Sequence, residues 1–232
     1  MSPRRVYIEA RGAILESPGS ELAGPFVTAF PVDGASISVL AGPATGLTLS
    51  ATDAVAARLD DLQFDLGEGP CWTALAHRVP VLMDSRTLDA EWPTFREALT
   101  NDALTQGVRT LHALPLAIGA LDIGAIDLYS GNAEPLSPEL ISEASLLADV
   151  AAWGVLRAIL RDHAQGYDNE SIGYARREVH QATGMIIVQL GVTPEDAELL
   201  LRAHAFASGV SVRAVAKDVV ERRLDFAARG ES

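Results

Sequence analysis

The spacing of apolar residues in this chain changes once, at Ser137 and Pro138. Before that point apolar residues come in short alternating runs, the longest of which, 108–118 and 123–131, stand close together. Such runs predict adjacent antiparallel strands. After that point apolar residues recur at steps of three and four, which is the spacing of helices. The sequence therefore predicts an α+β first part and an all-α second part.

The first part is predicted to contain an antiparallel sheet with covering helices between residues 20 and 163. Two further strands are expected at 35–42 and 46–52, close enough to form a hairpin, and another at 79–84. Helices are expected where apolar residues follow a capping residue or a Gly-Pro turn. They span residues 54–64, 70–77 and 92–100.

A long helix is predicted from Ser137, its cap, and Pro138, its first helical position, to about Arg161. One stripe of this helix combines small and apolar residues at alternating steps of four and three. Its members are Leu140, Ala144, Leu147, Ala151, Gly154 and Ala158. We interpret this stripe as the seam of a homodimer, because such spacing is typical of paired helices. A helix that covers its own sheet would show the same spacing.

The second part, residues 172–226, is predicted to form three short helices around one core. Gly191 ends the first helix, Thr193 caps the second, and Ser211 caps the third. The third helix carries the clearest apolar stripe. It consists of Val212, Val215, Ala216, Val219, Val220 and Leu224.

Three segments are predicted to lie outside the two domains. Residues 1–19 carry several charges and end in Ser-Pro-Gly-Ser, which predicts a flexible N-terminal tail. The helical spacing breaks off at 164–171, which we interpret as a linker. Residues 227–232 follow the last apolar position and are expected to form a C-terminal tail.

The composition excludes several classes of protein. Cys71 is the only cysteine, which excludes an internal disulfide, a CxxC redox pair and a thiolate-rich zinc site, and we predict no metal site. No run approaches the roughly 18 apolar residues of a membrane span, and the first residues do not form a secretion signal. We therefore expect a cytoplasmic protein with no membrane partner.

The net charge of −13 argues at first against a nucleic-acid partner. The charge is unevenly spread, however, because the residues from Asp168 onward include 8 basic and 10 acidic side chains. The helical part is close to neutral, so the composition does not exclude RNA.

The helical part resembles the ANTAR domain, a three-helix module that binds RNA in transcription antiterminators. The resemblance rests on the motifs QATGM, GVTPEDAELLLRAHA and AVAKDVV. The first part is similar to the GAF sensor domain in the motifs FDLGEGPCWTAL and IGAIDLYSG. The whole chain resembles the GAF-ANTAR regulators common in actinobacteria.

This resemblance implies a function. The ANTAR domains of a homodimer would bind two small hairpin loops in nascent RNA and so prevent a terminator stem from forming. A signal sensed by the GAF domain, such as a small molecule in its pocket, would control this activity. The sequence identifies neither the signal nor a cofactor.

Eight residues are predicted to contact RNA. They are Arg176, His180, Gln181, Thr183, Gly184, Arg202, Arg213 and Lys217. Gly184 costs a helix interior about 1 kcal/mol relative to alanine, which the close approach of a neighbouring helix or of an RNA loop would explain. Arginine pairs with phosphate and stacks on bases, although each cation could instead be a solvated residue paired with a local carboxylate.

The chain departs from the ANTAR pattern at two places. Family members resemble one another in a lysine before the glycine of the first helix and in basic residues that enter the third. Thr183 and Ser211 stand at those places here. This difference weakens the expected contact with phosphate, which a dimer would offset by avidity.

In the GAF-like part, the resemblance implies a ligand site between the sheet and its helices. The residues predicted to line it are Phe64, Cys71, Trp72, Arg109 and His112. Each has an alternative role, as a core aromatic, a small buried hydrophobe or a hydrogen-bonded structural histidine.

Two other functions are alternatives, a GAF-type enzyme and a DNA-binding or protein-interaction module. A GAF-type enzyme, such as one that reduces free methionine sulfoxide, would need a second thiol to resolve a sulfenic acid, and Cys71 is alone. A DNA-binding or protein-interaction module would present its third helix. The exposed positions of that helix are expected to alternate in charge, which makes insertion into a groove less attractive.

Overall fold

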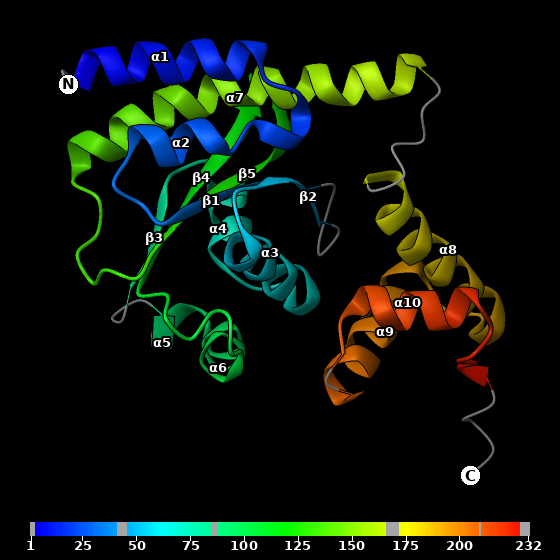
Figure 1. The fold of residues 1–232 in the computed structure, drawn as a ribbon. Helices are drawn as coiled ribbons and strands as arrows, with labels where there is room; N and C mark the ends of the chain where they lie inside the picture. Colours follow the sequence, from blue (N-terminus) through cyan, green and yellow to red (C-terminus); the bar gives the residue numbers. More distant parts are fainter. Residues whose placement is uncertain (1–2, 41–45, 85–87, 166–171, 209, 228–232) are drawn as a thin grey trace. The chain divides into compact units, whose positions relative to one another are not determined.

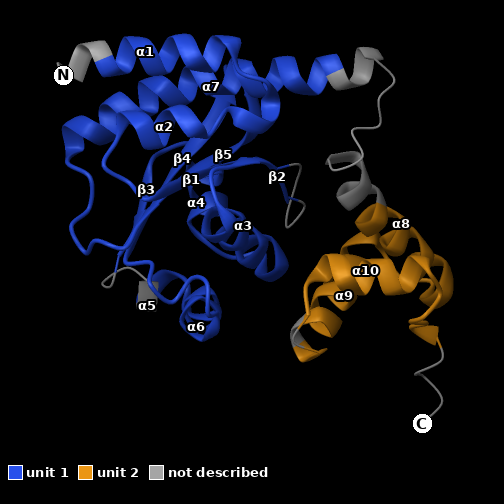
Figure 2. Ribbon diagram, viewed as in Figure 1, with its two compact units in different colours: residues 1–166 blue, residues 167–232 orange. Residues whose placement is uncertain are grey.

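The computed structural model describes residues 3–40, 46–84, 88–165, 172–208 and 210–227. The chain divides into two compact units, residues 1–166 and 167–232 (Figure 2). The predicted linker lies outside the described residues from residue 166 onward, and the predicted C-terminal tail does so from residue 228 onward.

The first unit is built on a five-stranded antiparallel sheet with the strand order β2-β1-β5-β4-β3 (Figure 1). The strands are β1 (Gly34–Leu40), β2 (Gly46–Ala51), β3 (Val81–Met83), β4 (Thr110–Ile118) and β5 (Leu121–Ser130). The two longest runs pair as predicted, with His112 opposite Leu128. The predicted hairpin of β1 and β2 is also confirmed.

Helices cover both faces of this sheet (Figure 1). The helices of the first unit are α1 (Pro3–Glu16), the short 3₁₀ helix η1 (Gly19–Glu21), α2 (Gly24–Ala29), α3 (Ala54–Leu66), α4 (Pro70–His77), α5 (Leu88–Glu91), α6 (Pro93–Asn101) and α7 (Pro138–Gln165). α1, α2 and α7 lie on one side of the sheet, and α3 and α4 lie on the other.

The prediction of a flexible N-terminal tail is wrong. Residues 3–16 form α1, which packs along α7 and buries Ala10 and Ile14. Nη2 of Arg157 on α7 donates to the carbonyl oxygen of Ile14 at 3.4 Å. Charged and apolar residues are mixed along this segment, so the sequence alone does not show that one face of it is buried. That face is recognised only from its contact with α7.

The interpretation of the α7 stripe as a dimer seam is also wrong. Ala144, Leu147 and Ala151 are fully buried within the first unit, where α7 packs on β4. A Cβ atom on Gly154 would lie 3.0 Å from a methyl carbon of Leu22, so this glycine admits the segment after η1. Leu140 and Ala158, at the two ends, are half-buried. The stripe covers its own sheet, because that sheet needs an apolar layer on this side.

On the opposite side, α3 and α6 pack over the sheet with β3 and the start of β4. Their shared core consists of Leu59, Leu62, Met83, Trp92, Phe95, Leu99, Val108 and Leu111. The α3 helix begins after Asp53, whose carboxylate accepts from the amides of Val55 and Ala56 at 2.8 and 2.9 Å. It ends at Gly67, which has a left-handed φ of 64°.

The second unit consists of α8 (Ile172–Leu190), α9 (Pro194–Ser208) and α10 (Val212–Val220), which confirms the predicted three helices. Their core consists of Ala182, Ile186, Ala197, Leu201, Ala205, Val215, Ala216 and Val219. Ser211 caps α10 as predicted, because its hydroxyl accepts from the amide of Ala214 at 3.2 Å. No helix in the described part of the chain is long and apolar enough to span a membrane.

Candidate nucleic-acid interface and sensor core

One side of α8 is turned away from the core of the second unit. Ala182 and Ile186 point into that core, so the residues on the other side of the helix face outward. His180, Gln181 and Gly184 are exposed, and Val188 is 85% exposed. We call these four residues the α8 surface.

Gly184 lies in the middle of the α8 surface and has open space around it. A Cβ atom built on Gly184 would meet no described atom within 4 Å, apart from the local backbone of its own helix. The close approach of a neighbouring helix of the same unit therefore does not explain this glycine. A mid-helix glycine costs about 1 kcal/mol relative to alanine, and no packing contact among the described atoms accounts for that cost.

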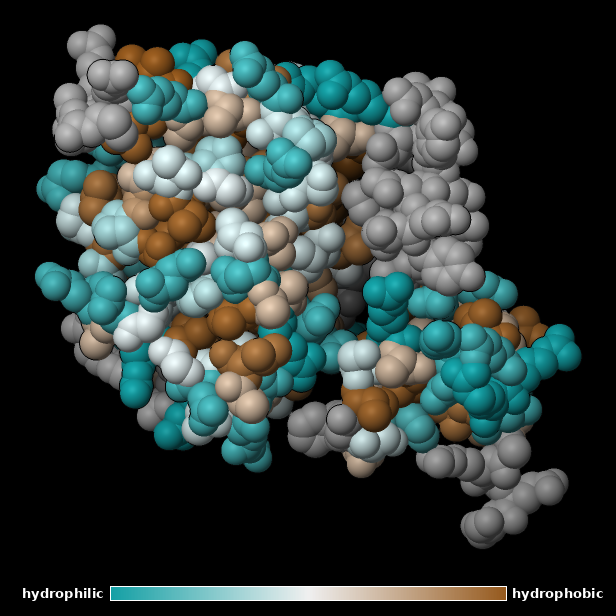
Figure 3. Space-filling model, in the orientation of Figure 1, coloured by the Kyte–Doolittle hydropathy of each residue, from teal (hydrophilic) through white to brown (hydrophobic). Residues whose placement is uncertain are grey.

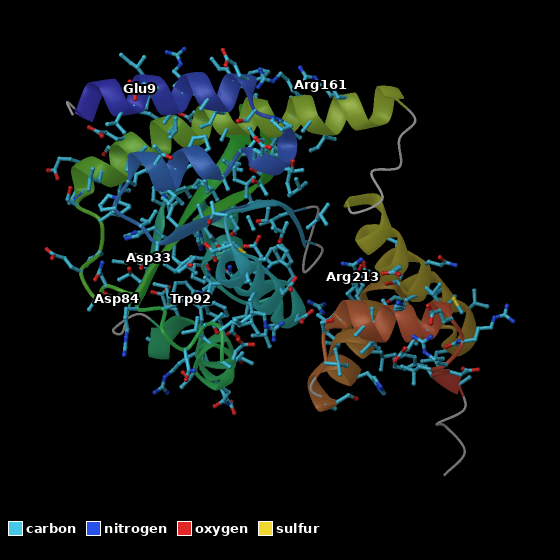
Figure 4. The ribbon with its side chains drawn as sticks, in the orientation of Figure 1. Glu9, Asp33, Asp84, Trp92, Arg161 and Arg213 are labelled. Atoms are coloured by element: carbon cyan, nitrogen blue, oxygen red, sulfur yellow. The ribbon has the colours of Figure 1, made fainter. Side chains whose placement is uncertain are left out.

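Helix α10, which packs on α8, carries two exposed cations. Arg213 and Lys217 are exposed and stand one turn apart on the same side of α10. Nε of Arg213, which is labelled in Figure 4, lies 3.3 Å from a carboxylate oxygen of Glu178 on α8. At the other end, the amide of Phe226 donates to Oε1 of Gln189 at 3.3 Å. These contacts place α10 alongside α8.

Two of the remaining residues predicted to contact RNA are not part of this group, and the side chain of the third is not among those described. The prediction that Thr183 contacts RNA is wrong, because Thr183 is buried and its hydroxyl donates to the carbonyl oxygen of Val179 at 2.8 Å. Arg202 is half-buried on α9, and no described hydrogen bond or ion pair joins it to the α8 surface. Arg176 belongs to α8, but its side chain lies outside those that the structure describes.

Sequence reasoning missed two further cations after α10. Arg222 is exposed and has a left-handed φ of 58°. Arg223 is exposed and forms ion pairs with Asp218 and Glu221. The two adjacent arginines in the sequence could have indicated a cationic site here. In the structure they follow the end of α10 at Val220.

In the first unit, three of the five predicted pocket residues come together. Phe64 on α3 and Trp72 on α4 meet edge to face with ring centroids 6.1 Å apart. Both pack against a cluster that contains fully buried Cys71 together with Leu40 and Ala125 of the sheet. The indole nitrogen of Trp72 donates to the carbonyl oxygen of Gln63 at 2.9 Å, which fixes the ring.

His112 and Arg109 do not join them, and their prediction as pocket residues is wrong. Leu111 packs with α3, so the next residue along β4, His112, points to the opposite face of the sheet. There its Nε2 accepts from the amide of Leu136 at 3.0 Å, and burial lowers the pKa of His112 to about 4. Arg109 is exposed, just before β4 begins.

A buried polar network beneath α3 was missed altogether. Both oxygens of Asp60 accept hydroxyl hydrogens, from Ser36 at 2.7 Å and from Thr48 at 2.8 Å. The amide nitrogen of Gln63 donates to Asp127 on β5, and the Gln63 oxygen accepts from the Cys71 amide at 2.9 Å. One indication of this network is present in the sequence, which is the acidic Asp127 among the apolar residues of β5.

Burial and mutual repulsion govern the protonation of this network. Burial, together with the charge of Asp127, raises the pKa of Asp60 well above its usual range. Burial raises the pKa of Asp127 to about 7, and its Oδ1 has no hydrogen-bond partner in the described structure. Burial and the same two carboxylates also raise the pKa of the Cys71 thiol. Among the described residues, no group of three or more His, Cys, Asp or Glu is placed to hold a metal ion.

Two models of known protein families match this chain. Residues 13–154, more than half of the chain, match the family model of the GAF domain. The chain belongs to the GAF domain family. Residues 174–220, which include the α8 surface and all of α10, match the model of the ANTAR domain. The curated proteins include no match to this sequence.

Solved structures share the fold of the GAF domain at low sequence identity. The GAF domain of an Acinetobacter phosphoenolpyruvate-protein phosphotransferase is 13% identical, with a TM-score of 0.53 over 72% of this chain and 99% of that one. The corresponding Coxiella burnetii domain gives the same identity and TM-score over 71% and 96%. The free methionine-R-sulfoxide reductase of Neisseria meningitidis is 14% identical, with a TM-score of 0.50 over 68% and 91%. These similarities show the fold alone.

Proposed function

We propose that this protein is a signal-responsive regulator of transcription whose ANTAR domain binds hairpin loops in nascent RNA. Two such domains, held in a homodimer, bind a pair of loops and prevent a terminator stem from forming. The GAF domain senses the signal. The observation that carries the proposal is Gly184 of the α8 surface, which is exposed and has open space around it. The helix α10, which packs on α8, adds the exposed cations Arg213 and Lys217.

The chemistry of this surface suits unpaired bases better than a duplex. Loop bases present their faces and edges, and Gly184 lets a base lie directly against the α8 backbone. His180 can stack on a base, and Gln181 can hydrogen-bond to a base edge. Arg213 and Lys217 on the adjoining helix α10 would contact phosphates beside the loop. Because these cations are few, affinity depends on avidity between the two domains of a dimer.

The GAF domain is proposed to act as a sensor and not as an enzyme. A thiol-based reaction needs an exposed thiolate, whereas Cys71 is 0% exposed and the pKa of its thiol is raised. The side of the sheet that carries Phe64, Cys71 and Trp72 is the proposed ligand-responsive region, since its aromatic rings adjoin a buried network with an unpartnered carboxylate oxygen.

Binding to a labelled RNA with two hairpins, compared with duplex DNA of equal length, tests the proposal. We expect tighter binding to the RNA and loss of that binding in Gly184→Leu, whose side chain would occupy the space of a base. Ala207→Leu adds the same bulk at an exposed position of α9 and should bind normally. Preference for the duplex, or equal binding by both variants, would contradict the proposal.

A further inference from the structure

Helix α7 carries a second apolar stripe on the side away from its sheet. Leu146, Trp153 and Leu160 are 56%, 56% and 58% exposed, and they follow one another at steps of seven residues, or two helical turns. On neighbouring α1, Ile8 and Leu15 are exposed with the same spacing. Figure 3 shows hydrophobic residues at the surface along these helices. A repeated ridge of this kind marks a contact surface.

The charges beside this stripe are segregated along the helix. Of the charged side chains that the structure describes in α7, three acidic ones precede Trp153 and two basic ones follow it. The acidic residues are Glu139, Glu143 and Asp149, and the basic ones are Arg157 and Arg161, which Figure 4 labels towards the C-terminal end of α7. A surface that is acidic at one end and basic at the other complements a second copy running in the opposite direction.

The apolar and charged patterns share one centre of symmetry. If two α7 helices cross in opposite directions at Trp153, residues equally far from that position face each other. Leu146 then meets Leu160 of the second copy, and Asp149 meets half-buried Arg157 of the second copy, whose Nη2 also donates to Ile14 within its own unit. Pairing in the same direction would instead set Asp149 against its own counterpart, which is repulsive.

We propose that two copies of this chain associate through this stripe, with their α7 helices antiparallel and centred on Trp153. A consequence rests on the proposed function. Gln165, the last residue of α7, lies 12 residues after Trp153. At 1.5 Å per residue, the two helix ends that lead to the ANTAR domains stand about 36 Å apart. On the proposed function, the two RNA-binding domains would be tethered from points about that far apart.

Cysteine cross-linking of the full-length protein tests the orientation. Leu146→Cys and Leu160→Cys are oxidised mildly, each alone and after mixing and subunit exchange. We expect a covalent dimer from the mixture only, since two copies of position 146 would lie about 21 Å apart in the antiparallel pair. Cross-linking of each variant with itself would reveal parallel pairing and overturn the proposal. Absence of a cross-link in every sample would also overturn it.

Sedimentation equilibrium without RNA tests the interface itself. Trp153→Glu should raise the dissociation constant of the dimer by about tenfold or more, as for a central anchor residue. Leu121→Glu, which changes a similarly exposed residue at the turn between β4 and β5, should leave it unchanged. Equal effects of the two variants would overturn the proposal. Because neither measurement uses RNA, its outcome is independent of the RNA-binding assay.

Discussion

The side-chain amide of Gln63 on α3 donates a hydrogen bond to Asp127 on the central strand β5. This bond joins a helix to the sheet across a buried region where Asp60 is also present. Neither Asp60 nor Asp127 has a cation among its described contacts, so burial favours the protonated form of both carboxyl groups. The interior of the GAF domain therefore holds protons that the unfolded chain would release near neutral pH.

Replacement of Asp127 by asparagine should change how stability depends on pH. The folded pKa of about 7 exceeds the ordinary value of 3.8, so the native state binds more protons between these values. The stability that Asp127 contributes is then greatest below pH 4 and falls as the pH rises towards 7, by at most about 1.4 kcal/mol per pH unit for one proton. Urea unfolding at pH 5 and pH 8 should show a smaller fall for Asp127→Asn. An identical fall would argue against a protonated Asp127.

His112 should contribute the opposite dependence. Burial lowers its pKa from 6.5 to about 4, so the unfolded state binds more protons between these values. Stability from this residue is complete above pH 6.5 and is lost as the pH falls towards 4. His112→Gln keeps an acceptor for the Leu136 amide and should lose less stability between pH 7 and pH 5 than the unmodified protein. The measurement is again urea unfolding.

Gly184→Ala separates stability from binding. Alanine should stabilise α8 by about 1 kcal/mol, because the helix loses a glycine and the new methyl group meets no described atom. The same methyl group should weaken RNA binding, because it holds a base away from the backbone. Thermal unfolding and RNA titration on the same sample measure both effects. A variant that is more stable and binds equally well would remove Gly184 from the interface.

Lys217→Gln should reduce the salt dependence of RNA binding. Loss of one phosphate contact lowers the slope of log affinity against log salt concentration by about 1. Arg223→Gln is a suitable control, since Arg223 is already paired with Asp218 and Glu221. Titrations at several salt concentrations compare the two variants. An equal change in both would indicate that the effect comes from net charge alone.

The Cys71 thiol should be unreactive in the folded protein. It is completely buried, and burial raises its pKa. A thiol-specific chromogenic reagent should modify it only after denaturant has unfolded the GAF domain. Rapid modification under native conditions would reopen the possibility of thiol chemistry.

The sequence by itself determined most of the elements and their order, but not α1. Periodicity predicted the adjacent strands β4 and β5, the long helix α7 and the three helices of the second unit, and local residues such as Ser211 predicted where a helix begins. These features depend on neighbours within a few residues, so the chain carries them locally.

Only the tertiary structure decided which faces are buried. Helix α7 has two apolar stripes with similar spacing, and only the position of the sheet shows that Leu147 is inside and Trp153 outside. Successive residues of β4 point to opposite faces of the sheet, and His112 therefore lies on the face away from Cys71. Folding brings Gln63 to Asp127, which lies 64 positions away along the chain. Periodicity records that a face is apolar, but burial depends on partners that lie far away along the chain.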